Sequence, residues 1–400
     1  MIPSACLEDL ITSSARVAVS DGVGTPRSVF TELSAAARRV GGVRLVLGWM
    51  PASDENLDLS AFADVRALMG GWGLRRAIDT GQAHYLPAAL GAAPALVRGP
   101  LRPDVLIASV VAVPGGYAFG SEVAWMRDAI DAGALVVGVV NNELPHADAG
   151  PHLPADRVTV VARHARPPIE IPVPRVDAVH AAIGRNVARL IPEGARVQVG
   201  PGALGAATLA ALRVPVCIDS GLLTDAAVDL DDRGLLLGDP IGTYLAGSRR
   251  LWTWADGRRL LHPIGTTHDG HRLSTGAPFI AVNTALELDL DAQVNVEGTT
   301  ASTLGGIGGH PDFAAAAARS TGLSVVALAT RHHGRPTLVD RLARPVSTPG
   351  HDVDVVVTEQ GVADLRGLDR GERRDALLSL WGAAANGRVA WPEVGGHDPP

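Results

Sequence analysis

The 400-residue sequence predicts an α/β protein made of two similar domains with mainly parallel sheets. Short apolar runs rich in Val, Ile and Leu alternate with helical stretches along the chain. These runs lack the polar alternation of a strand with one wet face, which indicates strands buried on both faces of a parallel sheet. A proline-rich segment interrupts the pattern, and the two halves that it separates begin alike.

The first half contains four predicted strands and a helix. The strands are expected within residues 14–22, 43–50, 103–113 and 134–141, where the apolar runs are continuous. Residues 25–40, TPRSVFTELSAAARRV, predict the helix between the first two strands. Strands that alternate with helices are typical of parallel sheets.

Residues 163–175, RHARPPIEIPVPR, form the predicted linker, because proline interrupts both helices and strands. We therefore expect an N-terminal domain over residues 1–175 and a C-terminal domain over residues 176–400. RVAVSDGVGTPRSVFTELSAA, from Arg16, and RVQVGPGALGAATLAAL, from Arg196, both predict a strand, a glycine turn and a helix. This faint repeat supports two similar domains, and open α/β sheets bind ligands at the C-terminal ends of their strands.

The composition argues against nucleic acid and membranes as partners of this protein. Hydrophobic residues make up 46% of the chain and charged residues 19%, which is enough for large cores. A net charge of -7 without a basic run argues against nucleic acid as a partner. No apolar run approaches the roughly 20 residues of a membrane span, and the start MIPSACLEDLITSS is acidic where a signal peptide is basic. We therefore expect a cytoplasmic protein with no membrane partner.

Residue usage also limits the chemistry. The sequence has no lysine, so arginine, histidine or backbone amides must make any cationic contact, and Schiff-base catalysis is excluded. Cys217, in the apolar segment VPVCID, is expected to be a buried, inert thiol. His268, His271 and the cluster Arg331–His333 lack partners at zinc-site spacing, so we interpret them as polar loop residues and expect no metal.

The most informative segment is residues 279–313, FIAVNTALELDLDAQVNVEGTTASTLGGIGGHPDF. Gly305–Gly309, GGIGG, precedes a predicted helix that starts at HPDFAAAAARS. Glycine lets the backbone approach a ligand closely, and helix N-termini attract anions. By itself the loop is equally compatible with a tight turn. Gly22–Pro26 and Gly200–Leu204 could also present amides to phosphate, but neither has the spacing of a P-loop or a dinucleotide fold.

Four blocks resemble the acetyl-CoA hydrolase/transferase family, which includes 4-hydroxybutyrate and succinyl-CoA:acetate CoA-transferases. They are AVNTALELDLDAQVN (281–295), GGIGGHPDF (305–313), DVDVVVTEQGVADLRG (352–367) and RVQVGPGALGAATLAAL (196–212). A looser match runs through the first half. The resemblance implies two CoA-transferase-type (NagB/RpiA-like) domains with a cleft between them, acyl-CoA as substrate, a small carboxylic acid as a further partner, and a homodimer.

The resemblance also implies site residues. Asn283 and the glycine loop are expected near the thioester oxygen. The coenzyme A site is expected along the glycine turn after Arg196 and at the glycine loop, which gives the candidate set Gly200, Gly202, Ala203, Leu204, Gly305, Gly306, Ile307, Gly308 and Gly309. The segment Met50–Ile78, rich in Gly and Trp, is a candidate for acyl-group selection. Glu359 is expected to be structural or to line the pocket.

The family's nucleophilic glutamate has no counterpart in this sequence. Relatives use it to form an acyl anhydride and then a glutamyl-CoA thioester, in a motif resembling GIHTEMxSDG. The matching stretch here, CIDSGLLTDA, places Gly221 at the glutamate position. Loss of a covalent nucleophile usually costs orders of magnitude in rate.

Three explanations remain open. Water could replace the nucleophile, with His310 as the base and the loop amides as an oxyanion hole; the alternative for His310 is an exposed residue at the helix start. A displaced carboxylate could act, with Glu297 as the first candidate and Asp219 or Asp225 as others, although aspartates after strands often cap turns. Finally, the protein could bind acyl-CoA as a sensor or partner subunit without turnover.

Overall fold

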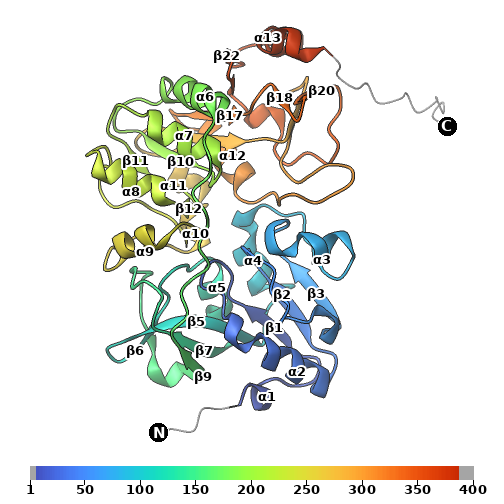
Figure 1. Cartoon of the computed structure of the whole chain (residues 1–400), viewed down its shortest axis with the longest axis vertical. Coiled ribbons are helices and arrows are strands. Elements are labelled where there is room, and N and C mark those ends of the chain that lie inside the picture. Colours follow the sequence, from blue (N-terminus) through green and yellow to red (C-terminus); the bar gives the residue numbers. More distant parts are fainter. Residues whose placement is uncertain (1–5, 387–400) are drawn as a thin grey trace, which may run out of the picture.

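The computed structural model describes residues 6–386, which form two lobes, each built on one sheet (Figure 1). The sheet of the first lobe has nine strands, and β4-β3-β2-β1-β5-β6-β8 are hydrogen-bonded in that order, while β7 pairs with β5 and β9. All pairs are parallel except β5–β6 and β6–β8. The strands are β1 (Arg16–Val19), β2 (Arg44–Leu47), β3 (Asp64–Ala67), β4 (His84–Tyr85), β5 (Val105–Val113), β6 (Gly116–Ala118), β7 (Leu135–Asn141), β8 (Leu153–Pro154) and β9 (Val158–His164).

The predicted helix over residues 25–40 is confirmed as α2 (Phe30–Val40), preceded by a short 3-10 turn at Arg27–Val29. Its apolar stripe buries Phe30, Leu33 and Ala37, and Gly41, at φ 72°, ends the helix. This stripe packs in a core on one face of the first sheet. The other helices of this lobe are α1 (Leu7–Leu10), α3 (Arg75–Asp79), α4 (Ala93–Arg98) and α5 (Met126–Asp131).

The sheet of the second lobe has six strands in the order β11-β10-β14-β17-β21-β22. They are β10 (Arg196–Val199), β11 (Cys217–Ile218), β14 (Phe279–Thr284), β17 (Leu323–Ala327), β21 (Val355–Thr358) and β22 (Gly361–Asp364). Only β21–β22 is antiparallel. Mainly parallel sheets, predicted from the apolar runs, are therefore confirmed in both lobes.

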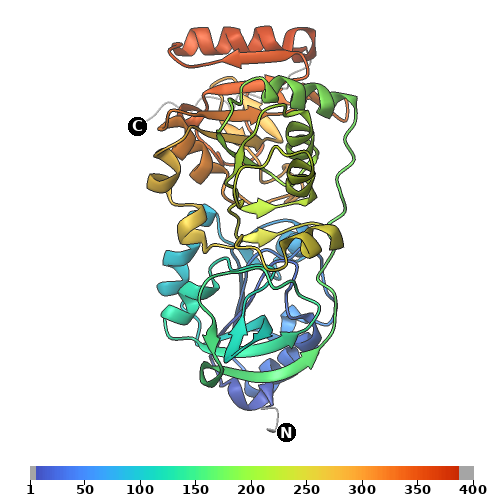
Figure 2. The same cartoon turned by 90° about the vertical axis from the view of Figure 1, so that its left-hand side faces the viewer.

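Helices and small strand pairs surround the second sheet. The helices are α6 (Ala178–Ala188), α7 (Ala203–Ala211), α8 (Asp225–Asp232), α9 (Arg249–Ala255), α10 (Ile264–Thr267), α11 (Gly270–Ser274), α12 (His310–Ala318) and α13 (Arg370–Trp381). The small strands are β12 (Leu222–Leu223) with β13 (Tyr244–Leu245), β15 (Glu287–Asp289) with β16 (Val294–Asn295) and β20 (Leu338–Val339), and β18 (Arg331–His332) with β19 (Arg335–Pro336). Figure 2 shows α13 and β22 at the outer end of this lobe, away from the first lobe.

The predicted linker is largely irregular. Its first two residues extend β9, and no helix or strand follows until α6 begins at Ala178. The chain crosses between the lobes along one side of the molecule (Figure 2), and we keep residue 175 as the predicted boundary. One hydrophobic cluster includes residues of both lobes, among them Trp49, Trp125, Tyr244 and Ile264, so the lobes share a buried seam.

No helix in the described part of the chain is both long and apolar enough to cross a membrane.

Candidate functional site

A pocket of about 280 Å³ lies at the seam, and we call it the central pocket. The second lobe contributes the C-terminal ends of β10, β11 and β14, three neighbouring parallel strands. The first lobe contributes four apolar side chains. Gly221 and the loop Gly305–Gly309 both lie on the wall, so residues far apart in sequence meet here. The wall consists of Trp49, Met69, Trp72, Leu90, Gln198, Val199, Gly200, Pro201, Ser220, Gly221, Leu222, Tyr244, His268, Asn283, Thr284, Val296, Gly305, Gly306, Ile307, Gly308, Gly309, His310 and Phe313.

Because Gly221 has no side chain, a space in the central pocket stays open at this position. A Cβ built on it would lie 3.4 Å from His268 Cε1, 3.5 Å from His268 Nε2 and 3.6 Å from Phe313 Cζ, which are ordinary van der Waals distances. Its carbonyl accepts hydrogen bonds from the amides of Thr243 and Tyr244. The backbone at Gly221 is thus fixed, and a larger residue would enter the pocket without a clash at Cβ.

His268 is the imidazole beside Gly221. It lies in a turn, as expected for a polar loop residue, but it is buried on the pocket wall. It follows α10, is 7% exposed, and packs on Phe313 with ring centroids 4.6 Å apart. Nδ1 lies 2.8 Å from Thr267 Oγ1, and the Thr267 hydroxyl donates to Pro263 O at 3.5 Å. In the tautomer that satisfies both contacts, Nδ1–H donates to Thr267 and Nε2 is left as an acceptor. Burial lowers the His268 pKa to about 3, so the ring is neutral at physiological pH.

His310 lies at the start of α12, as predicted, but it is buried and not solvent-exposed. Its Nδ1 lies 2.7 Å from Thr348 Oγ1, while its buried Nε2 has no hydrogen-bond partner among the described residues. Burial lowers the His310 pKa to about 4. Asn283, at the end of β14, donates from Nδ2 to the His310 carbonyl at 3.3 Å. An unpartnered buried nitrogen on a pocket wall fits a site that a ligand or water completes.

The loop Gly305–Gly309 is held by the first lobe. Ile307 N donates to Tyr85 Oη at 2.9 Å, and Leu90 N donates to Gly308 O at 2.8 Å. Gly70 and Gly71 pack directly on the loop, where added Cβ atoms would lie 2.7 Å from Gly305 O and 2.4 Å from Leu304 O. The loop therefore has one conformation that depends on both lobes.

Some loop amides are free to bind a ligand. Ile307 N is used by Tyr85, and the amides of Leu304 and Gly305 donate to the Glu297 carbonyl. In the part of the chain that the structure describes, no hydrogen bond was found for the amides of Gly306, Gly308 and Gly309. These amides and the start of α12 can supply donors for a developing oxyanion.

The glycine turn after β10 lies only partly on the pocket. Gly200 lines the wall, whereas Gly202 caps α7 and the helix begins with Ala203 and Leu204. Cβ atoms on Gly200 or Gly202 would meet nothing within 4 Å. The turn is open enough for a ligand to pass, and the coenzyme A contact stays a prediction.

The carboxylate candidates lie elsewhere. Asp219 makes a bidentate ion pair with Arg272 at 2.7 and 2.8 Å and a longer one with Arg196 at 3.4 Å. Asp225 accepts from Ser248 N and Oγ, so it holds the residue that caps α9. Neither lines the central pocket. Each carboxylate is engaged in contacts within the protein, which does not favour either of them as a displaced nucleophile.

Glu297 and Glu359 also lie off the pocket wall. Glu297 is 9% exposed, accepts from Ser347 Oγ at 3.4 Å, and contacts Tyr85; burial raises the pKa of Glu297. It thus lies behind the glycine loop. Glu359 accepts from the amide and hydroxyl of Thr330, which agrees with its structural interpretation.

The turn Gly22–Pro26 is filled by the protein's own carboxylate. Glu122 Oε2 accepts from Gly24 N at 3.2 Å, so this turn does not offer that amide to phosphate. Nearby, Asp21 Oδ2 accepts from Trp49 N, Trp125 Nε1 and the Tyr244 hydroxyl at 2.9 to 3.1 Å. Burial raises the pKa of Asp21 to about 6 and that of Glu122 to about 8. The pair lies behind the pocket wall, where Tyr244 joins it to the second lobe.

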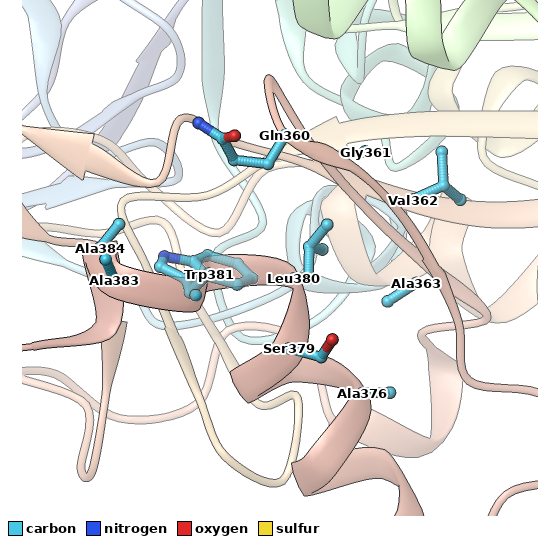
Figure 3. Close-up of a pocket in the computed structure, with 11 residues that line it drawn as sticks. Gln360, Gly361, Val362, Ala363, Ala376, Ser379, Leu380, Trp381, Ala383 and Ala384 are labelled. Carbon is cyan, nitrogen blue, oxygen red and sulfur yellow. The ribbon is translucent and has the colours of Figure 1, made fainter.

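A larger hollow of about 690 Å³ lies between β22 and α13 (Figure 3). In Figure 3, Gln360 and Val362 lie on the strand side, and Leu380, Ser379 and Ala376 on the helix. Its wall has no ionisable side chain. Catalysis at a thioester needs groups that move protons or charge, so the smaller central pocket is the better candidate. Among residues 6–386, no group of three or more His, Cys, Asp or Glu is placed to hold a metal ion.

Sequence reasoning missed His268, Tyr85 and Tyr244. His268 lies 47 positions from Gly221 in the numbering, and no motif spacing links them. A supporting signal existed only for the segment Met50–Ile78, whose Met69 and Trp72 do line the pocket.

Two parallel-sheet lobes with a pocket at their seam define a protein of the CoA-transferase fold class. Solved structures of similar fold include RipA from Yersinia pestis (TM-score 0.85, 21% identity, 95% of this chain and 93% of that chain). Another is 4-hydroxybutyrate CoA-transferase from Porphyromonas gingivalis (TM-score 0.74, 22% identity, 93% and 91%). These likenesses show the fold.

Sequence comparison identifies the C-terminal domain and shows which proteins the chain is similar to. Residues 247–386 match the acetyl-CoA hydrolase/transferase C-terminal domain. The 4-hydroxybutyrate coenzyme A transferase of Clostridium kluyveri is 26% identical over 334 residues, which cover 78% of each chain. Residues 247–386 thus carry an acetyl-CoA hydrolase/transferase C-terminal domain, and the chain is similar over most of its length to CoA-transferases and over a shorter part to acetyl-CoA hydrolases. These relatives support an enzyme that processes acyl-CoA.

Proposed function

We propose that this protein hydrolyses an acyl-CoA thioester with water as the nucleophile in place of a glutamate. The observation that carries the proposal is Gly221 on the wall of the central pocket, beside the acceptor nitrogen of His268. A carboxylate nucleophile is absent from this position, and the space next to the imidazole can hold water. Acyl-CoA processing is supported by the relatives; hydrolysis is the proposal.

In the proposed reaction, the water oxygen adds to the thioester carbonyl carbon while its proton passes to His268 Nε2. The amides of Gly306, Gly308 and Gly309 are the candidate donors to the oxyanion. Collapse of the tetrahedral intermediate breaks the carbon–sulfur bond, and the leaving thiolate takes up the proton from the imidazolium. The products are a carboxylic acid and coenzyme A thiol.

The low pKa of His268 has two consequences. The ring is unprotonated at neutral pH, so Nε2 is available to accept a hydrogen bond from water. A base with this pKa is weak, but an oxyanion forming nearby stabilises the imidazolium and raises the pKa during the reaction. We assign the base to His268 and not to His310, because only His268 is shown by distance to adjoin Gly221. His310 Nε2 is the candidate for a second contact to water or substrate.

The test is to incubate the protein with a panel of acyl-CoA thioesters, follow free thiol, and examine the protein by mass spectrometry after borohydride or hydroxylamine trapping. Hydrolysis predicts thiol release without a coenzyme A adduct and without acceleration by added acetate.

Two alternatives give other results. A displaced carboxylate, with Glu297 as the first candidate, would give an adduct and a rate that depends on the acceptor acid. A sensor or partner subunit would bind acyl-CoA without releasing thiol. In the proposed reaction a carboxylic acid is a product, and as an acceptor it belongs to the displaced-carboxylate alternative. The homodimer and a cytoplasmic location remain part of the proposal.

A further inference from the structure

We propose that the central pocket selects acyl-CoA thioesters whose acyl group is uncharged and apolar, and that it rejects those that end in a second carboxylate. This inference deepens the proposed function, because it names the substrate class of the same site. It rests on the chemistry of the pocket wall and on the groups immediately behind it.

The wall contains no Asp, Glu, Lys or Arg side chain. Its two imidazole rings, His268 and His310, are both buried and neutral at physiological pH. A carboxylate placed among them would lose its hydration without gaining a cation. Burying an unpaired charge in this way is strongly unfavourable.

The arginines near the pocket floor do not supply that cation. Arg272 and Arg196 both pair with Asp219, next to the wall residue Ser220. One carboxylate offsets only one of the two charges, but Arg196 also donates to several backbone carbonyls and neither arginine lines the pocket. On the side of the first lobe, the Tyr244 hydroxyl already donates to Asp21. A substrate carboxylate at Tyr244 would therefore find no free hydroxyl hydrogen, because that hydrogen is already donated to the carboxyl group of Asp21.

The first lobe supplies an apolar surface in place of charge. Trp49 makes edge-to-face contacts with Trp72 and Tyr244, at ring-centroid distances of 5.6 and 5.5 Å. Met69 and Leu90 complete this side of the wall. Aromatic and thioether side chains of this kind bind aliphatic or aromatic groups by burying apolar area.

Two properties of Trp72 fit a residue that contacts a bound acyl group. It is 44% exposed although it is a large aromatic, and its backbone has φ 48°, a conformation that non-glycine residues seldom adopt. Strained backbone positions of this kind persist where function requires them. An acyl chain seated on the Trp72 ring would remove apolar surface from water on both partners.

The test uses thioethers of coenzyme A, which lack the carbonyl and cannot be hydrolysed, so binding is measured without turnover. Butyl-CoA and 3-carboxypropyl-CoA differ at the chain end by a methyl against a carboxylate. By calorimetric titration we expect butyl-CoA to bind about 100-fold more tightly than 3-carboxypropyl-CoA. Equal affinities, or tighter binding of the carboxylate, would overturn the inference.

Two variants make the result specific to the pocket. Trp72→Ala changes a half-exposed residue and should fold; we expect it to weaken butyl-CoA about 10-fold while free coenzyme A binds as before. Val362→Ala, at β22 far from the pocket, is the matched control and should change nothing. If Trp72→Ala weakens free coenzyme A equally, the ring contacts the cofactor portion and the assignment to the acyl group is wrong. If the protein binds butyl-CoA more tightly than 3-carboxypropyl-CoA but does not hydrolyse acyl-CoA, only the proposed reaction is wrong, and the inference about the acyl group stands.

Discussion

At the residue scale, the position of Gly221 separates two reactions that one pocket could support. A carboxylate there would attack the thioester and retain coenzyme A on the protein, whereas a hydrogen atom leaves room for water. The neighbouring residues leave room for a side chain at Gly221, because a Cβ built there would lie at least 3.4 Å from their atoms. The position is thus open to a larger residue.

Gly221→Glu should therefore introduce covalent chemistry. We expect the variant to form a glutamyl-CoA thioester that can be trapped, and to gain transfer to acetate at the expense of thiol release. The measurement is intact-protein mass spectrometry with a parallel assay for acetyl-CoA formation.

Gly221→Gln is the matched control, with the same length but no nucleophilic carboxylate. It should form no adduct and should lose hydrolysis, because the side chain fills the water site. An adduct in unmodified protein, or on Gly221→Gln, would show that the nucleophile lies elsewhere.

His268→Ala should lower kcat for hydrolysis by about 100-fold, in the range usual for loss of a general base. His268→Gln retains an acceptor for water and should recover part of the rate. His271→Ala changes an exposed histidine three residues away and should leave kcat unchanged. Steady-state thiol release across pH 5–8 checks this, since a ring with a pKa of about 3 gives no acidic limb in that range. If His268→Ala and His271→Ala lower kcat equally, His268 is not the general base.

Prediction from the sequence reached Gly221 but not His268, for a physical reason. Gly221 belongs to a motif whose order along the chain carries the information. His268 lies beside Gly221 because it follows α10 and packs on Phe313. Packing of this kind cannot be deduced from the order of residues along the chain. For the same reason, Asp219 was a fair candidate until its ion pair with Arg272 was visible.

At the element scale, the loop Gly305–Gly309 depends on the absence of a side chain at Gly309. Gly309 has φ −85°, an ordinary value for any residue, yet a Cβ there would lie 2.4 Å from His268 Nε2 and 2.7 Å from Phe313 Cε2. Glycine at this position lets the imidazole stand against the loop. The strand before the loop and the helix after it could be predicted from sequence, whereas the clamp from Tyr85 and Leu90 could not, because it joins residues more than 200 positions apart.

Gly309→Ala should therefore displace His268 and cost about 1–3 kcal/mol of unfolding free energy, as expected for overpacking. Hydrolysis should fall with it. Gly200→Ala adds the same methyl group on the same pocket wall, where nothing lies within 4 Å, so its stability should be close to that of the unmodified protein. Urea unfolding of both variants is the measurement. Similar stabilities would mean that the loop yields, and that it does not fix the imidazole.

At the scale of the whole molecule, the lobes are joined by a seam that contains buried acids. Asp21 and Tyr244 form a hydrogen bond across it, and Glu122 fills the glycine turn of the first lobe. Apolar periodicity and the proline-rich linker predicted α/β architecture and a boundary between two parts, and the resemblance to CoA-transferases implied a cleft between them. The sequence could not predict this buried polar contact, since acids inside a core leave no periodic pattern.

The seam predicts how stability depends on pH. Burial raises the pKa of Glu122 from its ordinary 4.5 to about 8, so the folded protein keeps a proton that the unfolded chain releases above about pH 4.5. Stability should therefore fall as pH rises through this window and level off above pH 8, by at most about 1.4 kcal/mol per pH unit. The buried histidines act in the opposite direction, but only below their ordinary pKa of 6.5, and the contribution of Asp21 ends near pH 6.

The range from pH 6.5 to 8 thus isolates Glu122. Glu122→Gln keeps the shape and hydrogen-bonding capacity of the protonated acid but cannot titrate, so its unfolding free energy should vary less over this range. Glu193→Gln, which changes an exposed glutamate, should retain the slope of the unmodified protein. Urea unfolding followed by tryptophan fluorescence at half-unit pH steps gives the three curves. If Glu122→Gln and the unmodified protein have the same slope, Glu122 is ionised in the folded seam, and a cation or water not apparent from its present contacts must compensate its charge.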